Sequence, residues 1–177
     1  MANIRDIATP REPTVDRPQF PTGYISSETL AELLPWSHVR IQLEAAKVYW
    51  IASVRPNGRP HVSPVWGIWL DEQFYFDGSP ETRRMRNIAV NPAIAVHLDS
   101  RNDGAEVVML EGHAHLVEQP PRLLTERIAA AYTTKYIAEK YAPSPDTWDQ
   151  GGLYVVAPTV VIAWTNFQKN PTRWRFA

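Results

Sequence analysis

The chain has 177 residues, of which 44% are hydrophobic and 21% charged, and its formal net charge is -1 at pH 7. This size and composition fit one globular domain with a proper core, and the near-neutral charge disfavours bulk binding to nucleic acid or to anionic membranes. The absence of cysteine excludes disulfides, thiol nucleophiles and cysteine-held metal or iron–sulfur centres. Residues 1–13 lack an apolar signal segment, and no apolar stretch approaches the ~18–20 residues of a membrane helix. We therefore expect a cytoplasmic protein without membrane or nucleic-acid partners.

Residues 1–23 contain four prolines and little periodicity, which indicates an extended N-terminal arm. Two interpretations stay open: the arm is a loose tail, or it clasps a partner subunit through Phe20 and Tyr24. Residues 24–177 then form the folded domain. Its first elements are a short helix over 26–34 and a second helix over 36–46.

The pattern next changes to β-branched and aromatic residues. Strands are predicted over 47–55, 59–70 and 74–77, with a Pro-Asn-Gly turn at 56–58, and together they form an antiparallel meander. Pro60 and Pro64 indicate bulges or an unpaired edge in the second of these strands.

A short helix follows, with the sequence Ser79-Pro80-Glu81 predicting its cap and first turn. The remaining predicted elements are strands over 93–100 and 105–117, a long helix over 119–140, a loop over 141–152, one or two strands over 153–164 and a final segment over 172–176. Gly112 indicates a bulge in the second of these strands. Six or so short antiparallel strands with two or three inserted helices favour a small, closed or partly closed β-barrel.

The first candidate site is an arginine cluster at the start of the short helix. Arg83, Arg84 and Arg86 follow Gly78 and Ser79, where unpaired N–H groups and the helix dipole favour an anion. Arginine at a helix N-terminus opposes the dipole, so an ordinary solvated face would carry acid there instead. A phosphate site and a solvated helix face remain equally favoured.

The second candidate is the proline-interrupted strand 61–69. Backbone groups that a proline leaves unpaired can meet the edge of a heterocycle, and Ser63, Val65 and Trp66 would then face a flat ligand. The alternative is an ordinary edge strand whose tryptophans belong to the core or to an interface.

Other chemical signals are weak. His113 and His115 share one face of a strand, but an isolated pair of this kind is more typical of a structural pair than of a metal site. No nucleophile elbow, Walker loop, zinc-protease motif or dinucleotide fingerprint occurs. We therefore expect no metal and no catalytic residue pair. The C-terminal sequence Thr-Arg-Trp-Arg-Phe either docks a ligand or is a structural tail.

The order of these motifs resembles a known family. The sequences RPNGRPHVSPVWGIW, FYFDGSPETRRMRNIAVNPAIAV, EGHAHLV and the terminal TRWRF are similar to those of flavin/deazaflavin-dependent oxidoreductases, in the pyridoxamine 5′-phosphate oxidase-like superfamily. The resemblance extends from about Val48 to Arg175 and implies a mainly β, split β-barrel fold in an obligate homodimer. True pyridoxamine-phosphate oxidases carry a different C-terminal signature, so oxidation of that vitamin is not expected.

The resemblance implies two cofactor sites at the dimer interface. A strand segment would lie along the cofactor ring, and it comprises His61, Ser63, Pro64, Val65 and Trp66. The cofactor phosphate would be held by Gly78, Ser79, Thr82, Arg83 and Arg84. The pocket would be closed, within the chain or from the partner subunit, by Trp164, Arg173 and Trp174.

The sequence is closer to the branch that often uses the deazaflavin coenzyme F-420. The implied activity is therefore hydride transfer from reduced F-420 to a small unsaturated substrate. FMN in a flavin reductase or oxidase is one alternative, since FMN enzymes share these motifs. A non-catalytic flavin- or haem-binding protein is another.

Overall fold

The computed structural model describes residues 13–26 and 30–176 of the chain. Within them lie the helices α1 (Trp36–Ala45), α2 (Arg83–Val90) and α3 (Arg122–Lys135) and the 3-10 helix η3 (Pro145–Trp148). The strands are β1 (Thr14–Asp16), β2 (Tyr49–Val54), β3 (Pro60–Val65), β4 (Gly67–Leu70), β5 (Gln73–Asp77), β6 (Ala93–Leu98), β7 (Val107–Leu116), β8 (Leu153–Trp164) and β9 (Thr172–Arg175).

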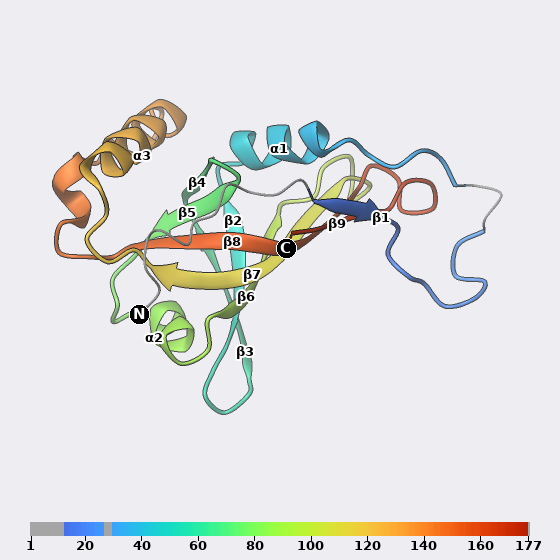
Figure 1. Cartoon of the computed structure of the whole chain (residues 1–177), viewed down its shortest axis with the longest axis horizontal. Coiled ribbons are helices and arrows are strands. Elements are labelled where there is room, and N and C mark those ends of the chain that lie inside the picture. Colours follow the sequence, from blue (N-terminus) through green and yellow to red (C-terminus); the bar gives the residue numbers. More distant parts are fainter. Residues whose placement is uncertain (1–12, 27–29, 177) are drawn as a thin grey trace.

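The strands form one antiparallel sheet that curls without closing (Figure 1). Its order is β1-β9-β8-β7-β6-β2-β3, with β4 and β5 joined to it through β8. Strand β3 ends this order, so its second edge is unpaired among the described strands, in line with its two prolines. The mainly β, split-barrel fold predicted from the sequence is confirmed.

The twelve-residue strand β8 joins the two parts of the sheet. One of its edges pairs with β7, while the other pairs with β5 at its start and with β9 at its end. The register with β7 shifts at Gly112, where Thr159 of β8 is passed over. A Cβ at Gly112 would lie 2.4 Å from the Ala157 carbonyl oxygen, so this irregularity requires glycine.

Two apolar clusters hold the elements together. The larger fills the curl of the sheet beneath α1 and α2, with Trp174, Phe74 and Met85 among its members. The smaller packs α3 and η3 against the outer side of β4 and β5, around Tyr132 and Trp148. Helix α3 therefore covers the opposite side of β4 from the main core.

The structure corrects several predicted boundaries. The predicted strand 59–70 is broken at Trp66 into β3 and β4, and these pair with different strands, β2 and β5, so the meander is interrupted. The long helix is confined to Arg122–Lys135, and the predicted loop after it contains η3. The short helix predicted over 26–34 is wrong in its described part, because residues 30–34 are not helical.

The N-terminal arm is ordered where it meets the C-terminal strand. Strand β1 pairs with β9, and Asp16 forms ion pairs with Arg173 and Arg175. Beyond β1, the rings of Phe20 and Tyr24 stack and meet Phe167 edge-on. The described part of the arm thus packs on its own chain, and Figure 1 shows the segment after β1 extending away from the sheet.

No helix among the described residues is long and apolar enough to cross a membrane.

Candidate functional site

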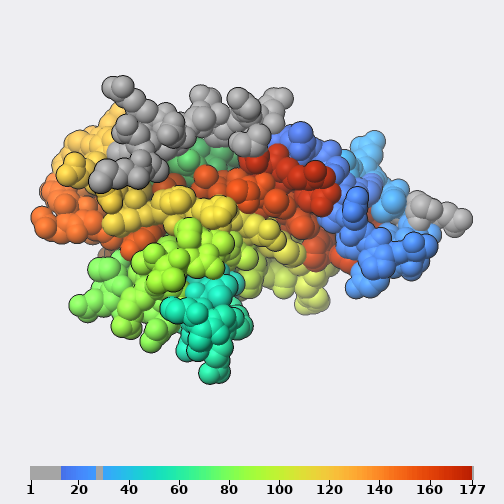
Figure 2. All heavy atoms as spheres, turned by 60° about the horizontal axis from the view of Figure 1, so that its bottom comes forward, coloured from blue at the N-terminus to red at the C-terminus, as the bar shows by residue number. Residues whose placement is uncertain are grey.

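The candidate site lies where helix α2 meets strand β3. Arg84 Nη1 on α2 donates a hydrogen bond of 2.9 Å to Ser63 Oγ on β3. In Figure 2 the hairpin of β2 and β3 projects beside α2 on one face of the molecule. The structure thereby brings together residues from the two motifs that the sequence analysis singled out, 21 positions apart in the chain.

Arg84 is a largely buried cation with incomplete hydrogen bonding. Its Nε is buried and has no partner in the described structure, and its guanidinium forms no ion pair there. Burial lowers the pKa of Arg84, although the nearby Asp77 and Tyr154 act in the opposite direction. A buried cation without a counter-ion is costly, and an anionic ligand would remove that cost.

Further positive charge surrounds this arginine. Burial lowers the pKa of His61, and repulsion from Arg55, Arg84 and Arg83 lowers it further, so all these groups lie near one another. The buried atoms His61 Nδ1 and Arg55 Nε also lack hydrogen-bond partners within the described ranges. Unsatisfied buried polar atoms of this kind are uncommon in native structures, and a bound ligand is one explanation for them.

The start of α2 differs in detail from the prediction. Thr82, not Ser79, is the N-cap, and its Oγ1 accepts a weak hydrogen bond of 3.4 Å from Met85 N. Ser79 lies one turn earlier, and its Oγ accepts from Glu81 N at 3.3 Å. Pro80 cannot start the helix, because the chain turns again between Ser79 and Thr82. The first helical residues are therefore Arg83 and Arg84, and the first turn contains no acid.

Gly78 leaves room for the Arg84 side chain. A Cβ at this position would lie 3.1 Å from Arg84 Nη2 and 2.8 Å from Met85 Cε. The Gly78 amide donates to the Gly152 carbonyl oxygen at 3.1 Å, which fastens this turn to the start of β8. Gly152 has a φ of +92°, a conformation that glycine adopts readily.

A shallow cavity of about 420 Å³ lies beside this turn. Its walls include Gly78 and Ser79, the aromatic residues Trp148 and Tyr154, and Leu116. Gly78 and Ser79 thus belong both to the turn beside Arg84 and to the wall of this cavity.

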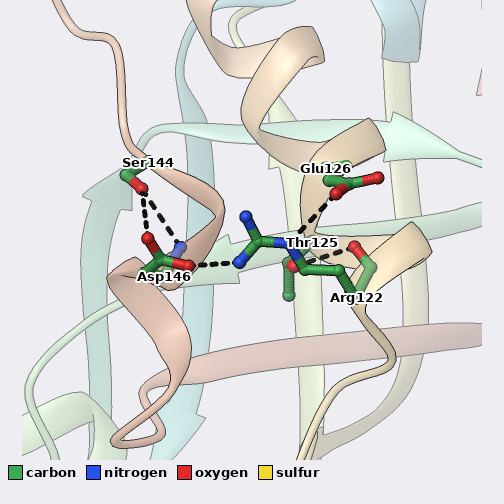
Figure 3. Close-up of polar contacts among 5 residues, drawn as sticks. All are labelled: Arg122, Thr125, Glu126, Ser144 and Asp146. Carbon is green, nitrogen blue, oxygen red and sulfur yellow. Dashed lines mark hydrogen bonds and ion pairs between the residues drawn. The ribbon is translucent and has the colours of Figure 1, made fainter.

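Polar contacts join α3 to η3 (Figure 3), and Trp148 of η3 lines the cavity. Arg122 forms ion pairs with Glu126 of its own helix and with Asp146 of η3. Ser144 caps η3 by accepting from Asp146 N at 3.2 Å. The predicted loop over 141–152 is therefore a defined structure with a clear place beside the site.

Trp66 marks the break between β3 and β4 and remains 40% exposed. Its ring stacks on Tyr136, with the centroids 4.9 Å apart, and meets Tyr141 edge-on. Tyr136 OH accepts a hydrogen bond from Gly67 N at 2.9 Å, so the partner ring is itself held in place. Of the neighbouring predicted residues, Pro64 is exposed, whereas Val65 is buried in the core.

Three predicted site residues lie elsewhere in the chain. Trp164 ends β8, about 33 Å along the strand from Tyr154, and contacts Phe167. Arg173 pairs with Asp16, with two hydrogen bonds of 2.8 Å. Trp174 is 0% exposed in the main core, so its ring has no free face for a ligand in this chain.

The histidine pair on β7 stays a surface feature. The rings of His113 and His115 lie 6.5 Å apart on exposed positions. Among the described residues, no group of three or more His, Cys, Asp or Glu side chains could hold a metal ion.

Sequence reasoning missed several residues around the site. Tyr136 and Tyr141 support Trp66, and Arg55 adds to the positive charge near His61. The helical spacing of Tyr132 and Tyr136 was a usable signal for a buried aromatic face. Arg55 gave no signal, because only the β2–β3 hairpin brings it near α2.

The comparisons with known proteins agree with this architecture. The family model described as pyridoxamine 5′-phosphate oxidase matches residues 36–164. No curated protein matches the chain.

Among solved structures, an F-420 reductase is 24% identical, with a TM-score of 0.52, and the match covers 69% of this chain and 94% of the other. An FAD-binding protein from Mesorhizobium loti is 16% identical, with a TM-score of 0.58 and coverage of 80% and 95%. The haem storage protein HutZ from Vibrio cholerae is 20% identical, with a TM-score of 0.51 and coverage of 70% and 87%. At these identities the structural likeness shows a shared fold. The chain therefore belongs to the pyridoxamine 5′-phosphate oxidase-like family of split β-barrel proteins.

Proposed function

We propose that this protein is an oxidoreductase that binds coenzyme F-420 and acts on a small unsaturated substrate. The observation that carries the proposal is the largely buried Arg84 guanidinium, which contacts Ser63 and keeps Nε without a partner. A flat coenzyme with a phosphate group would supply the missing anion there. The F-420 reductase among the structures of this fold supports the choice of deazaflavin.

The residues at the α2–β3 junction fit such a coenzyme. Arg84, Arg83 and the turn at Ser79 would hold the phosphate, because guanidinium groups and helix-start amides both favour phosphate oxygens. The space above Gly78 would be needed for this contact, since a side chain there would displace Arg84. Thr82 serves the same site indirectly by fixing the first turn of α2.

The ring of the coenzyme would lie along the unpaired edge of β3. Ser63 and Pro64 lie on this edge. The exposed Trp66 follows the end of β3, and its ring stacks on Tyr136. Trp66 would contact the flat ring system by stacking or by its edge. His61 lies nearer the arginines and would contact the phosphate end of the coenzyme.

When bound, the coenzyme supplies the hydride, so the protein's contribution is binding, orientation and electrostatics. The positive charge of Arg55, Arg83 and Arg84 would favour the anionic reduced form of the coenzyme. The cavity walled by Trp148, Tyr154 and Leu116 is mainly apolar and would receive the substrate or an outer part of the coenzyme. A proton from solvent would complete the reduction, so the proposal requires no acid residue of the chain.

We also propose a homodimer, in which a second copy completes each site. Within one chain, Trp164 lies at the far end of β8 from Gly78 and cannot close the same pocket. A second chain would bring its own half-buried Trp164 near the first chain's site. Light scattering at micromolar concentration tests this arrangement, and a monomer would contradict it.

The decisive experiment is a side-by-side fluorescence titration of ligand-free protein with F-420 and FMN. We expect selective, sub-micromolar binding of F-420. A substrate screen with the reduced coenzyme would then follow, monitored by the return of the visible absorbance of the oxidised coenzyme.

Selective binding of FMN would instead favour a flavin reductase or oxidase, for which the FAD-binding relative of this fold is a precedent. Binding of neither, together with a haem absorption band on addition of haemin, would favour a haem-binding protein. Each of these results would replace the F-420 proposal.

A further inference from the structure

A second site is suggested by Lys135, which the proposed function does not use. Its Nζ lies between α3, β2 and β4, where it donates hydrogen bonds to Tyr49 OH at 2.7 Å and to the Gly67 carbonyl oxygen at 3.1 Å. Tyr49 OH in turn donates to the Leu43 carbonyl oxygen, so it accepts from the lysine. Both bonds can be made by a neutral amine as well as by an ammonium ion.

Besides its bond to carbon and these two hydrogen bonds, Nζ has one remaining tetrahedral position. No hydrogen-bond partner occupies that position in the described part of the chain. An ammonium group carries a proton there, whereas a neutral amine carries its lone pair. The two fixed hydrogen bonds therefore orient a neutral amine so that its lone pair is free. This is the arrangement that a nucleophilic lysine requires.

The surroundings favour the neutral amine. Burial lowers the pKa of Lys135 to about 7, and the more distant Glu44 carboxylate of α1 only partly offsets this. The other titratable groups that face Nζ are Tyr49 of β2 and Tyr136, which directly follows α3, and burial raises the pKa of each phenol, so both are uncharged at neutral pH. Lys135 forms no ion pair with any described carboxylate.

Lys135 also lines a cavity of about 480 Å³ between α1, β4 and α3. The apolar wall consists of Ile68, Trp69, Ala130 and Ala131, and Thr134 and Glu44 add polar atoms. This volume is of the size that holds small organic ligands. The cavity shares no lining residue with the one beside Gly78.

We propose that Lys135 is a nucleophilic amine that captures a small, uncharged aldehyde in this cavity as an imine. The Nζ lone pair attacks the carbonyl carbon and forms a C–N bond. The carbonyl oxygen then leaves as water with two protons from nitrogen, relayed through solvent. No oxidant or reductant is consumed. Protonation of the imine by solvent retains one N–H for the Tyr49 or Gly67 oxygen.

The charge of the cavity selects the class of aldehyde. Apart from Lys135, none of the described residues that line this cavity is a cation, and the N–H of the protonated imine is directed at the Tyr49 or Gly67 oxygen, so no separate cation is available to pair with a carboxylate or phosphate on the ligand. The Glu44 carboxylate would repel such a group. The apolar wall instead suits an aromatic or aliphatic aldehyde without charge.

The test is reductive alkylation of the full chain with benzaldehyde and sodium cyanoborohydride at pH 7. The chain has four lysines, so peptide mass spectrometry can follow each one separately. We expect Lys135 to react at least about ten-fold faster than Lys47, Lys140 or Lys169, because its amine lies in an apolar cavity with two hydrogen bonds that leave its lone pair free, and a nucleophilic lysine requires a free lone pair. Its rate should saturate with benzaldehyde concentration and level off above pH 7.

Two variants and one second probe complete the design. Lys135→Arg should remove the fast reaction while keeping a cation, and the matched Lys47→Arg should leave it unchanged. 4-Carboxybenzaldehyde should react with Lys135 several-fold more slowly than benzaldehyde. Equal labelling of all four lysines, a rate that rises linearly with benzaldehyde, or a preference for the carboxylated probe would overturn the proposal.

Discussion

Arg84 on α2 and Ser63 on β3 are joined by a hydrogen bond of 2.9 Å, and this bond satisfies only part of a largely buried guanidinium. The contact links the two sequence motifs that carry the family resemblance. It also explains why arginine begins a helix whose dipole disfavours positive charge: the same charge and the same free amides favour an anion. The predictions about the site follow from this pair.

Replacing Arg84 by alanine should weaken F-420 binding by roughly 1.5–3 kcal/mol, the usual magnitude for a hydrogen bond to a charged group. The measurement is a fluorescence titration of both proteins at the same ionic strength. Arg86→Ala is the matched control, because Arg86 lies on the same helix but is exposed and has no contact with Ser63. Equal affinities of the Arg84→Ala variant and the parent would rule out the phosphate assignment.

Gly78→Ala should also weaken coenzyme binding without a large loss of stability. The added Cβ would lie 3.1 Å from Arg84 Nη2 and 2.8 Å from the flexible end of Met85. The Arg84 side chain must therefore move, while the core adjusts through Met85. Thermal unfolding and the F-420 titration, measured on one sample, separate the two effects. A variant that binds as tightly as the parent would show that Arg84 is not positioned by this glycine.

Much of the fold could be predicted from the sequence, because its strands follow local rules. Alternating apolar residues predicted the strands that became β6 and β7. The Asn57-Gly58 pair predicted the turn between β2 and β3, and the prolines of β3 correctly indicated an edge strand. The two motifs of the proposed anion site could be singled out because each has local chemistry of its own. Their meeting at Arg84 and Ser63 was expected only from the family resemblance.

The errors arose where tertiary contacts decide the outcome. The predicted helix over 119–140 contains the apolar residues Leu123 and Ile137, yet they are 70% and 74% exposed, because α3 buries Thr125 and Tyr132 on its inner face and ends before Ile137. Trp174, which the sequence analysis named as a ligand contact, packs in the core of this chain against Trp36. A tryptophan in a short terminal strand has the same local sequence in either role.

Asp16→Asn should loosen the arm from the sheet. A hydrogen bond from Arg173 lowers the pKa of Asp16, and Arg175 adds to the effect, so the carboxylate is held in its charged form. Stability from a carboxylate with a lowered pKa is present above its ordinary pKa and is lost as the pH falls through the lowered value. The amides of β1 should therefore be less protected from hydrogen exchange, relative to their intrinsic exchange rates, in the variant at neutral pH and in the parent protein as the pH falls below 4.

Hydrogen exchange followed by mass spectrometry provides this measurement. Asp146→Asn is the control, because Asp146 is another exposed aspartate paired with an arginine, at the distant η3. It should leave exchange in β1 unchanged. Unaltered exchange of β1 in Asp16→Asn would show that the backbone pairing with β9 suffices to hold the arm.

Lys135 should make the stability of the protein depend on pH. Its pKa is lowered from an ordinary 10.5 to about 7 in the folded protein, so between these values the unfolded chain binds one more proton than the folded chain. The free energy of unfolding must then rise with pH across this window, by at most about 1.4 kcal/mol per pH unit for one group. Below pH 7 the lysine is charged in both states and contributes no slope.

Urea unfolding of the parent and of Lys135→Met at pH 7, 8 and 9 measures this contribution. Methionine keeps the apolar stem without the titrating amine, so the curve of the variant should be flatter than that of the parent. Lys47→Met removes a half-exposed lysine that is paired with Glu139. Its curve of unfolding free energy against pH should run parallel to that of the parent. Parallel curves for Lys135→Met and the parent would mean that the amine stays protonated in the folded protein, which would also remove the basis for its proposed reaction with aldehydes.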